Sequence, residues 1–132
     1  MIIFALAGCN RSGLDGNVWK FSGSDVKRGI DHYYSIPSVK KAGEGIFMVT
    51  TKVVPSKGKK AVEEATNVKN AYAVATIMEV GCKDKYVRVM EKDYQDKDGI
   101  SLKVEKDEMT MDSVRTVTKD MPIFTMYQEV CR

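Results

Sequence analysis

Alternating apolar and polar side chains predict β-strands along most of the chain. The clearest alternation covers 100–105, where Ile100, Leu102 and Val104 are separated by polar residues, as in a strand with one solvated face. The β-branched stretch 46–54 and the alternating stretch 72–82 predict two longer strands. Further strands are predicted at 19–22, 32–36, 86–94 and 114–118, with turns at 23–25 and 96–99.

Two segments change to the period of an α-helix. Apolar residues at helical spacing predict an amphipathic helix that Ser56 is placed to cap; they are Ala61, Val62, Ala65, Val68 and Tyr72. A shorter terminal helix is predicted from Asp120 and Pro122 to Cys131, because Asp caps helices and Pro is tolerated in a first turn. Strands and helices in one short chain place the fold in the α+β class.

Composition indicates one folded domain. The 132 residues are 43% hydrophobic and 30% charged, which is typical of a globular protein and not of a disordered chain. The net charge of +3 is too small and too mixed in sign to indicate a nucleic-acid partner. The chain has no apolar run close to the ~20 residues that a membrane-spanning helix needs.

The N-terminal residues suggest export from the cytoplasm. They include Leu6-Ala7-Gly8-Cys9, which resembles the lipobox of bacterial lipoproteins, whose cysteine receives a diacylglyceryl group. The stretch before Cys9 lacks a basic residue and is shorter than a complete signal peptide, so we expect the true start to lie upstream. We interpret 1–8 as a truncated lipoprotein signal segment, 9–17 as a flexible tether and 18–132 as one domain. A short first strand that ends in a free thiol is the alternative.

The remaining two cysteines are predicted to form a disulfide bond. Cys82 ends a predicted strand and Cys131 ends the predicted terminal helix, each on the apolar side of its element. An exported chain is in an oxidising compartment, where such a bond persists. It would hold a helix that is too short to be stable alone. Two buried free thiols are the alternative.

From Trp19 to Cys131 the order of features resembles the surface-adhesin protein E family of bacterial lipoproteins. The matching residues are Trp19, Asp31, Tyr34, Ser35, Ile36, Glu79, Cys82, Tyr86, Arg88, Tyr94, Asp98, Gly99, Pro122 and Cys131. The longer segment 94–99 and the stretch 121–123 depart from the family pattern. The resemblance implies an antiparallel sheet of about six strands with one crossing helix and a short C-terminal helix, closed by one disulfide.

The sequence shows no motif for catalysis. His32 is the single histidine, and it has neither a recognisable nucleophile motif nor a second histidine for a metal site. Asp96, Asp98 and Glu105 match three positions of a calcium loop, but Tyr94 occupies the first. A hairpin turn explains the same residues. We therefore expect no enzyme, no metal and no cofactor.

Lysines supply the one candidate binding patch. A loosely basic region suits a protein or an anionic glycan as partner, although a solvated surface is the simpler interpretation. The residues of this candidate patch are Lys40, Lys41, Lys57, Lys59 and Lys60.

These observations favour a non-catalytic lipoprotein of the bacterial cell envelope, attached to the membrane by a lipid on Cys9. Asn10 in place of Asp after this cysteine favours the outer membrane, with the domain facing the periplasm or the cell surface. The family name suggests an adhesin-like domain that binds a protein or matrix component. A periplasmic inhibitor of a lysozyme-type enzyme is an alternative, because 21–27 faintly resembles the Ser-Gly loop of lipoprotein lysozyme inhibitors. A structural envelope component is another; the oligomeric state stays open, with a dimer as one option.

Overall fold

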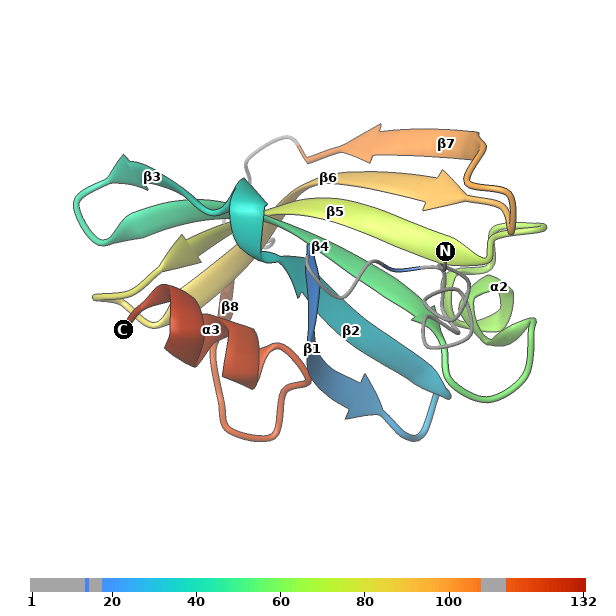
Figure 1. The fold of residues 1–132 in the computed structure, drawn as a ribbon, viewed down its shortest axis with the longest axis horizontal. Coiled ribbons are helices and arrows are strands. Elements are labelled where there is room, and N and C mark those ends of the chain that lie inside the picture. Colours follow the sequence, from blue (N-terminus) through green and yellow to red (C-terminus); the bar gives the residue numbers. More distant parts are fainter. Residues whose placement is uncertain (1–13, 15–17, 108–113) are drawn as a thin grey trace, which may run out of the picture.

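An antiparallel sheet forms the body of the domain (Figure 1). The computed structural model describes Leu14 and residues 18–107 and 114–132. In this part of the chain, six main strands lie in the order β1-β2-β4-β5-β6-β7, while β3 pairs with β4 and β8 pairs with β6. The strands are β1 (Trp19–Asp25), β2 (Ile30–Ser35), β3 (Lys40–Gly43), β4 (Ile46–Pro55), β5 (Ala73–Gly81), β6 (Tyr86–Gln95), β7 (Ser101–Lys106) and β8 (Val114–Thr116). The predicted α+β fold with an antiparallel sheet is confirmed.

The helical elements are short. They are the 3-10 helix η1 (Ile36–Ser38), the helix α2 (Ala61–Thr66) and the C-terminal helix α3 (Phe124–Val130). Figure 1 shows α2 and α3 near opposite ends of the sheet. Neither is long enough to be stable in isolation, so both depend on packing against the strands.

Strand register assigns each residue to one of two faces of the sheet. One row of register partners crosses all six main strands through Phe21, Tyr33, Lys52, Ala75, Asp93 and Val104. A neighbouring row crosses them through Lys20, Tyr34, Thr51, Thr76, Lys92 and Glu105. Successive residues of a strand point to opposite faces. We call the face of the first row the open face and that of the second the covered face.

The main core lies between the covered face and the two α-helices. Met126 of α3 is fully buried in one cluster with Val49 and Val80. At the other end, Val62 of α2 packs in a second cluster with Tyr94 of β6. Between these clusters, the buried hydroxyl groups of the register partners Thr51 and Thr76 form a hydrogen bond. Their polarity is satisfied inside the core, as burial requires.

Both α-helices are shorter than the sequence pattern predicted. The helix α2 ends at Thr66, since Asn67 takes a left-handed conformation with φ of 59° and closes it. Neither Ser56 nor Asp120 caps a helix: the N-caps are Lys60 and Ile123, without side-chain hydrogen bonds. Val68 lies beyond α2 but still packs against its cluster. The helical spacing of apolar residues thus extends beyond the helix, because Val68, in the following loop, contacts the same core cluster.

Two elements were not predicted from the sequence. The strand β3 has mostly exposed residues and pairs with β4 around the turn that includes Gly45. Its side chains carry no apolar alternation, so backbone pairing alone defines it. The 3-10 helix η1 follows β2 and contains Pro37, which suits an early position in such a turn.

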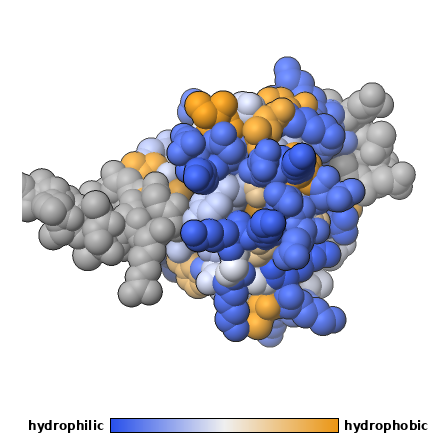
Figure 2. All heavy atoms as spheres, turned by 90° about the vertical axis from the view of Figure 1, so that its right-hand side faces the viewer, coloured by the Kyte–Doolittle hydropathy of each residue, from blue (hydrophilic) through white to orange (hydrophobic). Residues whose placement is uncertain are grey.

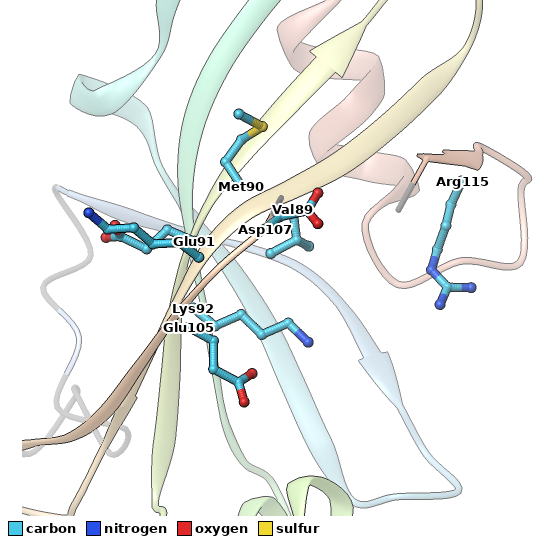
Figure 3. A pocket seen from close by; sticks show the side chains of 8 residues that line it. Val89, Met90, Glu91, Lys92, Glu105, Asp107 and Arg115 are labelled. Carbon is cyan, nitrogen blue, oxygen red and sulfur yellow. The ribbon is translucent and has the colours of Figure 1, made fainter. Parts of the chain in front are cut away.

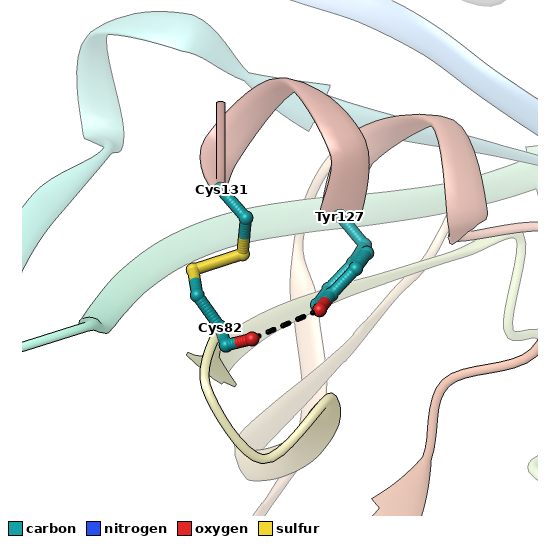
Figure 4. Close-up of a disulfide and its surroundings, with 3 residues drawn as sticks. All are labelled: Cys82, Tyr127 and Cys131. Atoms are coloured by element: carbon teal, nitrogen blue, oxygen red, sulfur yellow. Dashed lines mark hydrogen bonds between the residues drawn. A yellow bond between two sulfur atoms is a disulfide. The ribbon is translucent and has the colours of Figure 1, made fainter.

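The C-terminal helix is attached to the sheet at both of its ends. The predicted bond between Cys82 and Cys131 is present, with their Cα atoms 5.4 Å apart. Beside it, the Tyr127 hydroxyl donates to the Cys82 carbonyl at 3.1 Å (Figure 4). At the other end, the Ser22 hydroxyl donates to the Pro122 carbonyl at 2.8 Å. A side chain at position 23 would clash with Pro122, because a Cβ on Gly23 would stand 2.5 Å from its carbonyl oxygen.

We predict that replacing both Cys82 and Cys131 by alanine lowers the free energy of unfolding by about 4 kcal/mol, the chain-entropy value for a loop of this length. The two cysteines are 49 residues apart. Urea unfolding followed by circular dichroism measures the difference. Dithiothreitol should destabilise the native protein similarly and leave the double variant unchanged. Equal stability of the native and variant proteins would contradict a structural role for the bond.

Tyr94 connects the core to the outermost strand. Its side chain is 5% exposed, and its hydroxyl donates to Glu105 of β7 at 2.7 Å. Burial, followed by the hydrogen bond to Glu105, raises the pKa of Tyr94 to about 12. The same hydrogen bond lowers the pKa of Glu105. The folded protein therefore holds the phenol proton more firmly than the unfolded chain does.

We predict that stability falls as the pH rises from 10 towards 12, because the unfolded phenol loses its proton before the folded one. The shift corresponds to about 2 kcal/mol at the upper end of this window. The control is Tyr94→Phe, which keeps the ring but cannot ionise. Tyr34 and Tyr86 remain in both proteins, so the difference between the two pH profiles isolates Tyr94. Parallel profiles would refute this assignment.

Candidate functional site

The open face carries few covering groups in the part of the chain that the structure describes. Its most buried point is the seat of Leu14, whose side chain is 5% exposed. Leu14 forms a cluster with Val54 of β4 and Ala73 of β5. Position 14 lies inside the predicted tether, most of which falls outside the described residues. Leu14 itself packs against the domain.

An aromatic patch adjoins the Leu14 seat; we define it as Trp19, Phe21 and Tyr33. Trp19 and Tyr33 pack against the Leu14 cluster. Phe21, which is 48% exposed, meets Tyr33 edge to face with ring centroids 5.6 Å apart. The ammonium group of Lys52 stands 5.9 Å from the Trp19 ring centre, a distance at which cations are attracted to aromatic faces. Burial lowers the pKa of Lys52, and Asp93 partly opposes this.

The strand β7 forms one edge of the sheet and is exposed along its whole length. Val104, on the open face, is 51% exposed, and Leu102 and Ile100 are also exposed. Figure 2 shows one end of the domain as largely hydrophilic, with hydrophobic atoms at its upper edge, at the height of β7 in Figure 1, and smaller hydrophobic groups elsewhere. Exposed apolar side chains beside an edge with open backbone groups are features of a pairing surface.

A buried ionic cluster lies at the other end of the open face. Arg88 of β6 donates to Glu79 of β5 at 3.1 Å, and the Tyr86 hydroxyl donates to the same carboxylate at 2.6 Å. Gly81 allows Tyr86 to lie there, because a Cβ on Gly81 would meet the ring at 1.9 Å. These are residues on which the family resemblance rests. In this geometry Arg88 and Tyr86 both pair with the Glu79 carboxylate, as burial of charge favours, while the Arg88 Nε is buried without a hydrogen-bond partner in the described part of the chain.

A hollow of about 520 Å³ opens beside β6, where β7 and β8 pair with different parts of that strand. Figure 3 shows its side chains, with Arg115 standing apart from the others. The lining residues are Val89, Met90, Glu91, Lys92, Glu105, Lys106, Asp107 and Arg115. The described lining carries both acidic and basic side chains. Among the described residues that line it, none is a cysteine, serine or histidine that could serve as a nucleophile or base.

The predicted basic patch is divided between two ends of the sheet. Lys40 and Lys41 lie on β3 opposite Met48 and Phe47 of β4. Lys57, Lys59 and Lys60 follow the far end of β4, before α2. A strand advances about 3.3 Å per residue, so roughly 25 Å separates the two groups. The structure does not bring these five lysines together.

Cys9 and His32 are two other residues that the sequence singled out. Cys9, the predicted lipid attachment site, lies outside the described residues. His32 lies on β2, where burial lowers its pKa. Within the described ranges, no three histidine, cysteine or acidic side chains converge on a point that could hold a metal ion. None of the helices found there is long and apolar enough to cross a bilayer.

The segment that resembled a calcium loop is a hairpin turn. The Asp96 carboxylate accepts hydrogen bonds from the backbone N–H groups of Asp98 and Ile100, each at 2.9 Å. Gly99 has φ of 83°, which the turn requires and glycine permits. Glu105 binds the Tyr94 hydroxyl instead. The residues of the motif are therefore engaged in forming the turn and attaching β7.

The Ser-Gly segment that suggested a lysozyme-type inhibitor forms part of β1. Ser22 is buried, and its hydroxyl accepts the Met126 N–H at 3.2 Å while donating to Pro122. Gly23 faces Pro122. Ser22 and Gly23 therefore serve the attachment of the C-terminal segment. Ser24, Val26 and Lys27, from the same segment, are exposed at the end of β1 and in the turn that follows it.

We predict that Leu14→Ala lowers the free energy of unfolding by about 2–3 kcal/mol, the usual result of truncating a buried leucine. Val26 is an exposed residue in the turn between β1 and β2. Its replacement by alanine is the matched control and should change stability by less than about 0.5 kcal/mol. Urea unfolding of both variants measures the difference. A loss at Leu14 no larger than the control would show that position 14 belongs to a free tether.

Comparison with known proteins gives this chain no assignment. No protein-family model matches the chain, and the search of curated proteins found no match.

Proposed function

We propose that this chain is a non-catalytic lipoprotein of the bacterial cell envelope, whose domain binds a protein partner through the edge strand β7. The observation that carries the proposal is that every residue of β7 is exposed, including its apolar residues Leu102 and Val104. The strand is joined to the core of the domain, because its Glu105 accepts a hydrogen bond from the buried Tyr94.

Two features support export and anchoring. The bond between Cys82 and Cys131 is of the kind that persists in oxidising compartments. The segment Leu6-Ala7-Gly8-Cys9 provides a lipobox-like acylation site. An acyl group on Cys9 would hold the domain at a membrane, for which the outer membrane, facing the periplasm or the cell surface, is our proposal.

The form of β7 favours a partner that adds a strand. An edge strand presents unpaired N–H and C=O groups, and an extended peptide can pair with them while its side chains occupy neighbouring positions. Val104 offers an apolar contact on the open face. On the covered face, Lys103 and Glu105 form an exposed ion pair at 3.0 Å. Such a partner gains affinity from backbone pairing and specificity from side chains on both faces. A matrix protein or another envelope protein fits this description.

We predict saturable binding of the unacylated Cys9→Ser chain to at least one immobilised probe among fibronectin, laminin and heparin. Adding Val104→Lys should weaken binding at least about tenfold, since it places a charge in an apolar contact. The control is Val26→Lys, at a valine that is 73% exposed, against 51% for Val104, and that lies in the turn after β1, at the opposite end of the strand order from β7. Surface plasmon resonance provides the affinities.

Three results count against the proposal. Flat responses to every probe would remove adhesion of this kind. Equal losses from Val26→Lys and Val104→Lys would remove the role of β7. Binding to heparin alone that vanishes with moderate salt would indicate general electrostatic attraction.

A further inference from the structure

We propose that the aromatic patch on the open face rests on the lipid surface that holds Cys9, so that the domain has a fixed orientation on the membrane. This inference rests on the proposed acylation of Cys9 and goes beyond it, because a lipid anchor alone leaves the domain free to turn. The occupant of the patch is a phospholipid surface.

The first support is the length of chain between the anchor and the domain. Leu14 is seated in the open face against Val54 and Ala73. Cys9 is five residues earlier, and five residues extend at most about 18 Å. Six strands spaced about 4.8 Å apart span a greater width than this. The acyl chains must therefore enter the bilayer close to the Leu14 seat.

The second support is the chemistry of the surface next to that seat. Trp19 and Tyr33 are half-buried, and Phe21 is largely exposed. Tryptophan and tyrosine prefer the interface between hydrocarbon and water, because each combines an apolar ring with a polar group. The Lys52 ammonium beside Trp19 suits the phosphate level of a lipid headgroup region. The patch thus has the composition of an interfacial contact.

The third support is the effect of the tether on affinity. A short link converts the second contact into an intramolecular one with a high effective concentration. A patch of three aromatic side chains is too small for strong independent binding to a membrane. Because the patch adjoins Leu14, which is held within about 18 Å of the lipid, it needs only a weak preference for the membrane to stay there. The anchor and the patch therefore act together.

Trp19 is the single tryptophan of the chain, so its fluorescence reports on this patch alone. The test uses the acylated full chain, isolated from membranes and placed in vesicles of phosphatidylethanolamine and phosphatidylglycerol. Brominated acyl chains in the vesicles quench only a tryptophan that lies at the lipid surface. We expect them to reduce Trp19 emission by about half, as for an interfacial residue. Unchanged emission from acylated protein would overturn the proposal.

Two variants sharpen the test without reaching into the core. Phe21→Glu adds a charge at the exposed part of the patch and should remove at least half of the quenching. Val26→Glu adds the same charge at an exposed position beyond the end of β1, and quenching should persist. Equal loss in both variants would overturn the proposal. A change in Trp19 emission with protein concentration in the absence of lipid would assign the patch to a second copy of the chain and also overturn it.

The unacylated Cys9→Ser chain separates this inference from the proposed function. Intact mass of the native protein reports acylation directly. Acylated protein without quenching leaves the anchor intact and refutes the orientation. Protein that carries no lipid but is quenched by brominated vesicles, and behaves like Cys9→Ser, refutes the anchor and supports the patch. Protein with neither property refutes both.

Discussion

The structure depends on holding a small C-terminal helix against one face of a large sheet. The sheet must bury an apolar face, yet the two α-helices that cover it are only 6 and 7 residues long. Helices of this length have no stability of their own. The Cys82–Cys131 bond, the Ser22 hydroxyl and the missing side chain at Gly23 together hold the C-terminal segment in place. The helix that packs on the covered face is therefore held there by these specific interactions more than by its own length.

This arrangement leaves the opposite face for other uses. Both α-helices pack on the covered face. In the described part of the chain, Leu14 packs on the open face, next to the aromatic patch. The strand β7 is joined to the core by the hydrogen bond from Tyr94 to Glu105, while its residues are exposed and it pairs only with β6 among the described strands. In our proposals, the patch that contacts the membrane and the edge that binds a partner are two parts of one sheet.

The sequence predicted features that depend on local burial, such as single strands. It did not predict which residues from different parts of the chain lie close together. The strand at 100–105 alternates because each residue faces a different environment, and the structure has β7 over Ser101–Lys106. The five lysines of the basic patch carried no such constraint, because β4 separates Lys40 from Lys57 by its whole length. The Leu14 seat was missed because a lone leucine among polar residues has no period. Only its contact with Val54 and Ala73 reveals it.

The sequence by itself determined the α+β class, the main strands and the pairing of Cys82 with Cys131, because each follows from side-chain periodicity or from cysteine placement near element ends. Tertiary structure decided where the helices stop, how β3 pairs and which face stays open. These features depend on contacts between residues that are far apart in the chain, such as Ser22 with Pro122 and Tyr94 with Glu105. Such contacts leave no local pattern, since each side chain must satisfy a partner that only the folded sheet brings within reach.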